Sequence, residues 1–273
     1  NEPLSTELEL FGKTFKYPIF AGPVGAVSMH YSDAFNDTSY NDVLVKGCID
    51  AGICAFTGDG KDPSIMENAT RIIKENHGHG IPTVKPWSLE TYLEKLNLAL
   101  NSNAFAVAMD VDAAGLPFLK GCIPPAGRMN TEQLKEIISN TPVPFIVKGV
   151  MSVKGALKAK EAGASAIVVS NHGGRVQDQT PATAEVLEEI VKAVDGSMKI
   201  FVDGGLRNGV DVFKALALGA DAVIVARPFV NAIYGAKEEG IQVLVDKLGS
   251  ELVDTMEMCG AKSLKDITRD MVG

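Results

Sequence analysis

Short apolar runs alternate along the chain with longer segments of helical periodicity. Each apolar run spans four to six residues and ends at glycines or polar residues, which is typical of buried strands in a parallel sheet. The runs are Pro18–Ala21, Ile53–Thr57, Pro82–Lys85, Ala106–Val111, Pro144–Lys148, Ala166–Ser170, Ile200–Asp203 and Ala222–Ala226. The helical segments between them are Asp42–Ala51, Ser64–Glu75, Ser88–Leu100, Thr131–Ser139, Ser152–Ala162, Thr183–Val194 and Gly209–Leu218. Eight strand–helix repeats predict an α/β fold, the closed (β/α)8 TIM barrel, rather than an open doubly wound sheet.

A longer amphipathic segment, Glu238–Met258, follows the eighth repeat and is predicted to close the barrel. No stretch has the composition of a linker, so we expect a single domain over residues 1–273. This length is close to the roughly 250 residues that such barrels typically use. The chain begins at Asn1 rather than at Met, and we expect its N-terminal segment to be truncated.

Composition excludes several classes of partner. The net charge is -8 and the basic residues form no run, which argues against nucleic acid. No apolar stretch reaches the roughly 18 residues of a membrane span, and the start does not look like a signal peptide. The cysteines lack CxxC spacing, so we interpret them as reduced thiols of a cytoplasmic protein and expect neither disulfides nor a metal site. They are Cys48, Cys54, Cys122 and Cys259.

Polar residues follow the predicted strands at their carboxyl ends, which in a barrel meet at one mouth. His172 can exchange a proton near neutral pH, and Arg175 can hold a carboxylate through two hydrogen bonds. Lys148 ends a neighbouring strand and could stabilise negative charge there, although a solvated lysine is the alternative. Asp112 could reach His172 and fix its tautomer, or it could be a helix N-cap or a surface acid.

The other three histidines have different positions. His77 and His79 lie before the third strand, on the face of a barrel that serves stability, so we expect them to be surface residues. His30 follows the first strand, and either a surface role or a role at the mouth fits it.

The last two repeats carry a candidate phosphate site. Gly204 and Gly205 can turn backbone N–H groups toward an anion, and Arg207 and Arg227 can supply charge. The loops after strands seven and eight are the usual phosphate site of this fold. Two ordinary turns with surface arginines are the alternative. Lysine and arginine are frequent at the strand ends of an otherwise acidic chain, which indicates an anionic ligand.

The sequence Ser170-Asn-His-Gly-Gly-Arg175, together with Asp203-Gly-Gly-Leu-Arg207, resembles the FMN-dependent α-hydroxy-acid oxidase and dehydrogenase family. That family includes glycolate oxidase, lactate oxidase and flavocytochrome-type lactate dehydrogenase. Val147-Lys148-Gly149, the segment Asp211–Gly219 and the segment Met258–Ser263 also match. The match is dense from residue 144 to residue 270, whereas the first 140 residues match only in outline.

The resemblance implies an FMN-dependent oxidoreductase that oxidises a small, anionic L-2-hydroxy acid, such as lactate or glycolate, to the 2-oxo acid. His172 would be the base, Asp112 would orient it, Lys148 would stabilise the reduced flavin, and Arg175 would hold the substrate carboxylate. The implied cofactor-binding residues are Pro23, Val24, Gly25, Thr57, Lys85, Asp110, Lys148, Ser170, His172, Gly173, Asp203, Gly204, Gly205, Arg207, Ala226 and Arg227. A homotetramer is implied as well.

The chain departs from the family at the substrate side. No tyrosine matches the family's N-terminal substrate tyrosine, and Trp87 replaces a second one, with Lys85 where a flavin-contacting glutamine is expected. Asp110 stands in the place of a threonine. The segment after Asp112 lacks the family's second substrate arginine, and Arg128 is the nearest candidate. Trp87 and Arg128 are therefore our candidates for completing the substrate site.

Two other functions fit part of the pattern. An FMN-dependent isomerase of the isopentenyl-diphosphate isomerase kind would share the phosphate-binding end of the barrel. A flavin-binding protein without turnover would explain the missing tyrosines. The presence of His172 and Arg175 favours oxidation over both. A nucleotide-oxidising relative would need a cysteine after strand six, and none lies between Cys122 and Cys259.

Overall fold

The computed structural model describes residues 3–123 and 125–273, and in that part of the chain eight parallel strands close into a barrel. Around the barrel the strands follow one another in chain order, and the last strand pairs with the first. They are β3 (Ile19–Ala21), β4 (Cys54–Thr57), β5 (Ile81–Val84), β6 (Val107–Asp110), β7 (Phe145–Val150), β8 (Ala166–Val169), β9 (Lys199–Asp203) and β10 (Ala222–Val225). The prediction of a TIM barrel is confirmed, because each apolar run overlaps a barrel strand and the ends of the two agree within two residues.

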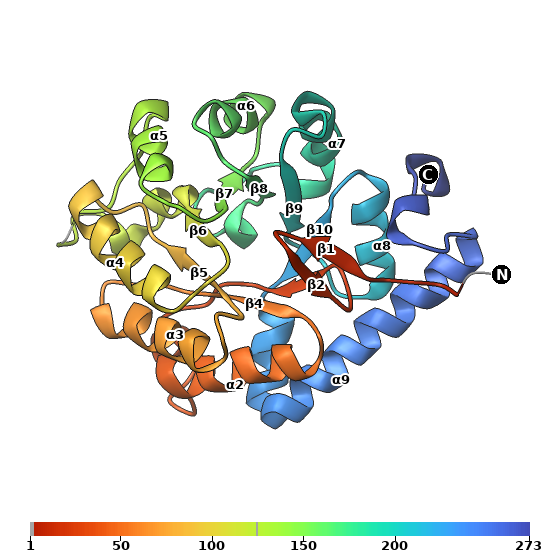
Figure 1. Ribbon diagram of the computed structural model, residues 1–273, viewed down its shortest axis with the longest axis horizontal. Helices are drawn as coiled ribbons and strands as arrows, with labels where there is room; N and C mark the ends of the chain where they lie inside the picture. The colour runs from red at the N-terminus through yellow and green to blue at the C-terminus, as the bar shows by residue number, and fades with distance from the viewer. Residues whose placement is uncertain (1–2, 124) are drawn as a thin grey trace.

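A ring of helices surrounds the barrel (Figure 1). The α-helices are α1 (Val27–His30), α2 (Asp37–Asp50), α3 (Pro63–Glu75), α4 (Leu89–Asn101), α5 (Thr131–Ser139), α6 (Val153–Glu161), α7 (Thr183–Val194), α8 (Gly209–Ala217) and α9 (Arg227–Cys259). Short 3-10 turns are η1 (Val111–Gly115), η2 (Pro117–Leu119), η3 (His172–Gly174), η4 (Leu264–Asp266) and η5 (Arg269–Met271). No helix within the two described ranges is both long enough and apolar enough to cross a membrane.

Two helices begin earlier than predicted. Helix α2 begins at Asp37 rather than Asp42, because Asn36 and Ser39 form a capping box in which the Ser39 N–H donates to Asn36 Oδ1 at 2.9 Å. Helix α9 begins at Arg227 rather than Glu238. Its dihedral angles are non-helical at Ala236 and Lys237, so a single periodicity cannot extend through both halves.

Phenylalanines fill the interior of the barrel below its mouth. Phe20, Phe56 and Phe201 point inward and contact one another edge to face, with ring centroids 5.3 to 5.9 Å apart. An antiparallel hairpin of β1 (Leu8–Leu10) and β2 (Lys13–Phe15), which was not predicted, crosses the barrel (Figure 1). Its Phe15 ring lies 5.0 Å from Phe20, so the hairpin covers the end of the barrel opposite the mouth.

Helix α8 packs so closely on α9 that only glycine fits at Gly209, where a Cβ would lie 2.3 Å from the backbone nitrogen of Leu252. Gly209→Ala should therefore lower the free energy of unfolding by about 1–3 kcal/mol, as measured by urea denaturation. Gly235→Ala is the control, because a Cβ there meets no atom within 4 Å. It should leave stability unchanged or slightly raised. Equal losses in the two variants would contradict this packing.

Candidate active site

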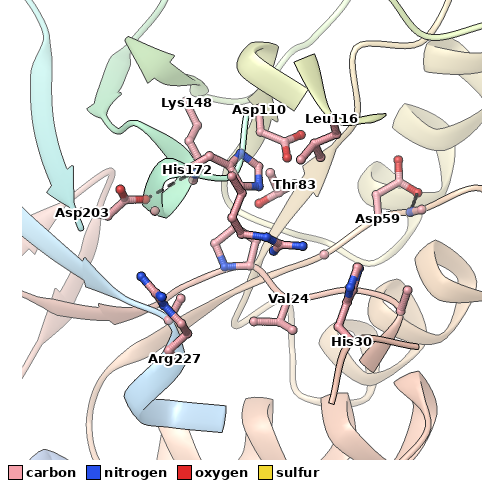
Figure 2. Close-up of a pocket in the computed structure, with 18 of the residues that line it drawn as sticks. Val24, His30, Asp59, Thr83, Asp110, Leu116, Lys148, His172, Asp203 and Arg227 are labelled. Atoms are coloured by element: carbon pink, nitrogen blue, oxygen red, sulfur yellow. Dashed lines mark hydrogen bonds and ion pairs between the residues drawn. The ribbon is translucent and has the colours of Figure 1, made fainter. Parts of the chain in front are cut away.

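The carboxyl ends of the barrel strands open into a cavity of about 630 Å³, which is within the range of small-molecule sites. Each of the eight strands, or the segment that follows it, contributes to the wall. Figure 2 shows Lys148, Asp110 and Asp203 on one side of this cavity and His30 and Val24 on another. The predicted convergence of polar strand ends is therefore present.

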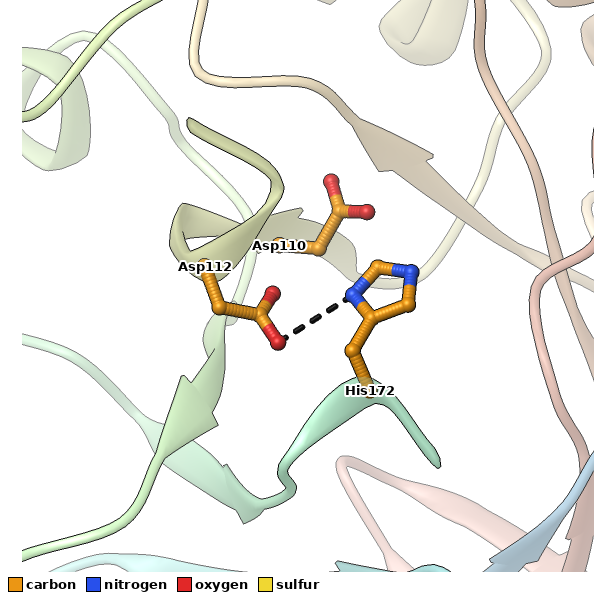
Figure 3. Close-up of side chains that lie close together, drawn as sticks. All are labelled: Asp110, Asp112 and His172. Carbon is orange, nitrogen blue, oxygen red and sulfur yellow. Dashed lines mark hydrogen bonds and ion pairs between the residues drawn. The ribbon is translucent and has the colours of Figure 1, made fainter. Parts of the chain in front are cut away.

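His172 and Asp112 form a hydrogen-bonded pair at the mouth (Figure 3). Their Nδ1 and Oδ2 atoms lie 3.1 Å apart. Gly149 makes room for this pair, since a Cβ there would lie 2.4 Å from Asp112 Cγ. Burial by itself would raise the pKa of Asp112, but the Lys148 charge and the His172 contact outweigh burial and lower it. An ionised carboxylate only accepts, so His172 Nδ1–H donates and Nε2 is left as the basic nitrogen.

Lys148 is a buried cation at the end of β7, with 3% of its surface exposed. Its ammonium donates to Ser170 Oγ at 3.0 Å and lies 3.5 Å from Asp203 Oδ2. Burial would lower the pKa of Lys148, but Asp203, Asp112 and Asp110 together raise it. Ser170 Oγ also accepts the His172 backbone N–H at 3.1 Å, which ties the lysine to the histidine segment.

A second cation, Lys85, forms an ion pair with Asp110 across the ends of β5 and β6. Both side chains line the cavity and are largely buried. Asp59, at the end of the neighbouring strand, holds this region in place. Its carboxylate accepts the Lys85 backbone N–H at 3.0 Å, the Trp87 indole N–H at 2.7 Å and the Lys95 ammonium at 2.5 Å.

The opposite end of the cavity is suited to an anion. Gly204 and Gly205 have φ values of +92° and +81°, and a Cβ on Gly205 would meet no atom within 4 Å. Arg227 is the first residue of helix α9, so its side chain lies beside a helix N-terminus that favours negative charge. Gly173 lies close to it, because a Cβ there would be 3.0 Å from Arg227 Nη2.

Three buried oxygens of residues that line the cavity have no hydrogen-bond partner within the described chain. They are Thr83 Oγ1, Asp110 Oδ1 and Asp203 Oδ1. Buried polar atoms in folded proteins are nearly always paired, so these atoms call for a ligand with donors and acceptors at matching places. They come from β5, β6 and β9, which places the expected polar contacts around much of the mouth.

Most of the predicted site residues line this cavity. They are Pro23, Val24, Gly25, Lys85, Asp110, Lys148, His172, Gly173, Arg175, Asp203, Gly204, Gly205, Arg207, Ala226 and Arg227. Asp112 and Ser170 lie behind the wall and act on His172 and Lys148. Thr57 is fully buried and is also absent from the wall.

The two candidates for completing the substrate site do not reach it. Trp87 is 1% exposed and does not line the cavity, and its indole N–H donates to Asp59, a residue that does line it. A buried indole N–H needs a hydrogen-bond acceptor, and the buried Asp59 carboxylate provides one. Arg128 is exposed and does not line the cavity. The structure therefore gives neither residue a direct contact with a ligand there.

Further residues line the cavity; the sequence left the role of His30 open and gave no prediction for the others named here. Met29, His30 and Tyr31 come from α1 and the residue after it, Leu116 comes from the segment between η1 and η2, and Ile65 comes from the first turn of α3. A tyrosine thus does reach the site, from a sequence context unlike that of the family tyrosines. The only sequence signal for these residues was their position after the first, second and fourth barrel strands.

Asp110, Asp112 and His172 could in geometric terms hold a cation, because one ligand atom of each lies within 4.8 Å of the others. However, Asp110 is paired with Lys85, and Asp112 is paired with His172 beside the Lys148 ammonium. These nearby positive charges already compensate the carboxylates and disfavour an added metal ion.

Residues 104–273 match the family model described as FMN-dependent dehydrogenase. A peroxisomal (S)-2-hydroxyacid oxidase of Arabidopsis thaliana is 48% identical over 134 residues, which cover 49% of this chain and 37% of that protein. An L-lactate oxidase of a Roseobacter species (strain GAI101) is 44% identical over 141 residues, covering 52% of this chain and 38% of that protein. The aligned part therefore spans less than half the length of these curated relatives.

Solved structures extend the likeness to nearly the whole chain. A mandelate oxidase variant with (S)-mandelic acid aligns with a TM-score of 0.82 and 27% identity, over 98% of this chain and 81% of the other. A mandelate oxidase with (S)-4-hydroxymandelic acid gives a TM-score of 0.81 at 25% identity, over 98% and 82% of the two chains. The N-terminal half thus keeps the barrel geometry although its sequence match is weak.

The lowered pKa of Asp112 has a consequence for stability. Since its folded pKa lies below the ordinary value of about 3.9, the ionised carboxylate stabilises the fold above that pH, and this contribution is lost as pH falls through the folded pKa. Asp112→Asn should therefore lower the free energy of unfolding at pH 7, and the deficit should shrink below about pH 4. Urea denaturation at several pH values measures this. A pH-independent deficit would contradict it, and the exposed control Asp33→Asn should stay within about 0.5 kcal/mol of the wild type throughout.

Proposed function

Since the chain belongs to the FMN-dependent dehydrogenase family, we propose that it oxidises a small L-2-hydroxy acid to the corresponding 2-oxo acid. The observation that carries this proposal is the oriented His172, with basic Nε2, in the same cavity as Arg175. A base and a carboxylate-binding group side by side are what oxidation of a 2-hydroxy acid requires. The names of the aligned relatives, which include hydroxy-acid, lactate and mandelate oxidases, support the same substrate class.

The residues of the cavity fit FMN. The phosphate would be held by the Gly204 and Gly205 backbone and by Arg227 at the N-terminus of α9. The unpartnered oxygens of Thr83 and Asp110 match the need of a flavin ring for polar partners along one edge. When bound, FMN supplies the two-electron acceptor that side chains cannot provide. The cavity thus offers separate places for the two ends of this cofactor.

His172 would take one of the two protons that the substrate loses. Asp112 fixes the Nδ1–H tautomer and stabilises the imidazolium that forms, so the proton is received at Nε2. Arg175 would hold the substrate carboxylate, because a guanidinium can donate two parallel hydrogen bonds to it. Lys148, held by Ser170 and Asp203, would supply a fixed positive charge that favours negative charge developing beside it.

Arg227→Ala should weaken FMN binding by about 10- to 100-fold, because it removes a charge-assisted hydrogen bond to the phosphate. Fluorescence titration of the flavin measures the dissociation constant. Riboflavin, which lacks the phosphate, is the matched ligand control and should bind wild type and variant equally. Equal weakening of FMN and riboflavin would instead place the effect of Arg227 away from the phosphate.

His172→Gln should lower the rate of anaerobic flavin reduction by a 2-hydroxy acid about 10²- to 10⁴-fold, since an amide cannot accept the proton. Stopped-flow absorbance of the FMN-loaded protein, mixed with a panel of 2-hydroxy acids, measures this rate. FMN affinity serves as the control for folding. Reduction at the wild-type rate would refute the mechanism, and wild-type protein that no acid reduces would refute the function.

We propose two further properties, the location and the oligomeric state of the protein. A cytoplasmic location is supported by the four cysteines, none of which forms a disulfide in the described chain. Some aligned relatives carry the name peroxisomal, so localisation of a tagged full-length protein is the relevant test. A homotetramer rests on the family resemblance alone, and light scattering after size-exclusion chromatography tests it.

A further inference from the structure

The cavity contains a histidine that the mechanism above does not use. His30 is the last residue of α1, and its side chain lines the same cavity as Arg175 and Lys85. Figure 2 shows its ring directed into the cavity from the side opposite Lys148 and Asp110. His30, Lys85 and Arg175 therefore reach one space from three different places on the barrel rim, following β3, β5 and β8 respectively.

The position of His30 is fixed by its surroundings. Backbone hydrogen bonds close the turn that carries it, since the His30 N–H donates to Ala26 O at 3.1 Å and the Tyr31 N–H donates to Val27 O at 2.9 Å. The following residue, Tyr31, packs its ring against Tyr234 of α9, with centroids 6.2 Å apart. Because both ends of the turn are held, the imidazole is presented to the cavity without a large cost in conformational entropy.

The charges around His30 favour an anion at this place. Burial is the largest cause that lowers the pKa of His30, and the positive charges of Arg175 and Lys85 lower it further, while Asp37 acts in the opposite direction. A neutral imidazole carries one N–H donor. A carboxylate placed between Arg175 and His30 would meet a cation and a donor, and it would offset the repulsion that the two cations exert on a protonated ring.

We propose that His30 is a substrate-binding residue that donates a hydrogen bond to the carboxylate held by Arg175. The proposal rests on the 2-hydroxy-acid function given above. It supplies the second carboxylate contact that Arg128, lying outside the cavity, does not provide. The substrate carboxylate is then bound by one guanidinium and one imidazole, and the imidazole makes this binding site titratable.

The test uses oxalate, which carries a carboxylate beside further oxygens but has no carbon-bound hydrogen to lose. His30→Phe keeps a ring of similar breadth and removes the donor. It should weaken oxalate binding to the FMN-loaded protein by about 10- to 100-fold, the usual effect of losing a hydrogen bond to a charged group. Isothermal titration calorimetry measures this. His30→Gln, whose amide can still donate, should recover part of the affinity.

Proton uptake provides a second readout that a purely structural role would not move. An anion beside His30 raises the lowered pKa of the ring, so oxalate binding should take up protons at pH values between the free and the bound pKa. In that range the affinity of the wild type should fall as pH rises. The proton uptake and the pH dependence should both be smaller in His30→Phe than in the wild type. Titration in two buffers of different ionisation enthalpy gives the number of protons directly.

The exposed His77 provides the matched control, and His77→Asn should change neither the oxalate affinity nor the proton uptake. Unchanged oxalate affinity in both His30 variants would overturn the proposal. FMN affinity shows whether each variant is folded. If His30→Phe fails that check, His30→Gln decides the matter through proton uptake, which should be smaller than in the wild type because an amide does not titrate. Failure of the 2-hydroxy-acid function has a separate signature, namely wild-type protein that binds FMN and oxalate but is reduced by no hydroxy acid.

Discussion

A buried ammonium group organises the mouth of this barrel. Lys148 is removed from water, and a charge in such a place is tolerated only when opposite charges and hydrogen bonds compensate it. The compensation comes from Asp110 in β6, Asp112 in the turn η1 that follows it, and Asp203 in β9. Two of these carboxylates have a second role, since Asp110 pairs with Lys85 and Asp112 orients His172. Two of the carboxylates that compensate the charge of Lys148 therefore also position other residues of the site.

The barrel could be predicted from the sequence because its strands are buried on both faces. A run such as Ala166–Ser170 then has no polar interruption, and its end is marked by the polar residues of the site. The hairpin of β1 and β2 escaped prediction because three-residue strands contain too few positions for a pattern to emerge. The start of α9 was missed for a different reason. The backbone is non-helical at Ala236 and Lys237, so the apolar positions before and after this break do not follow one continuous helical periodicity.

The site residues were predictable where they follow a strand directly and unpredictable where a loop decides their direction. Lys148 lies in β7, His172 and Arg227 follow β8 and β10, and the closed barrel brings them together. Trp87 also follows a strand, yet the acceptor that turns it away is Asp59 on a neighbouring strand end, and one sequence cannot reveal that pairing. His30 lies on a short turn, so its place in the cavity that Arg175 also lines became visible only in three dimensions.

The pairing of β3 with β10 joins segments about two hundred residues apart, and it has a consequence for assembly. Contacts of such sequence separation form late, because a long loop must be ordered before they contribute. Pro23 and Arg227, which lie on the two sides of this seam, line one cavity. A ligand that contacts both residues would hold the first and last strands of the barrel together. Because it would bind the closed barrel and not a partly opened form, it would shift the equilibrium toward the closed barrel by mass action. The stability of the barrel would then rise with the concentration of the cofactor.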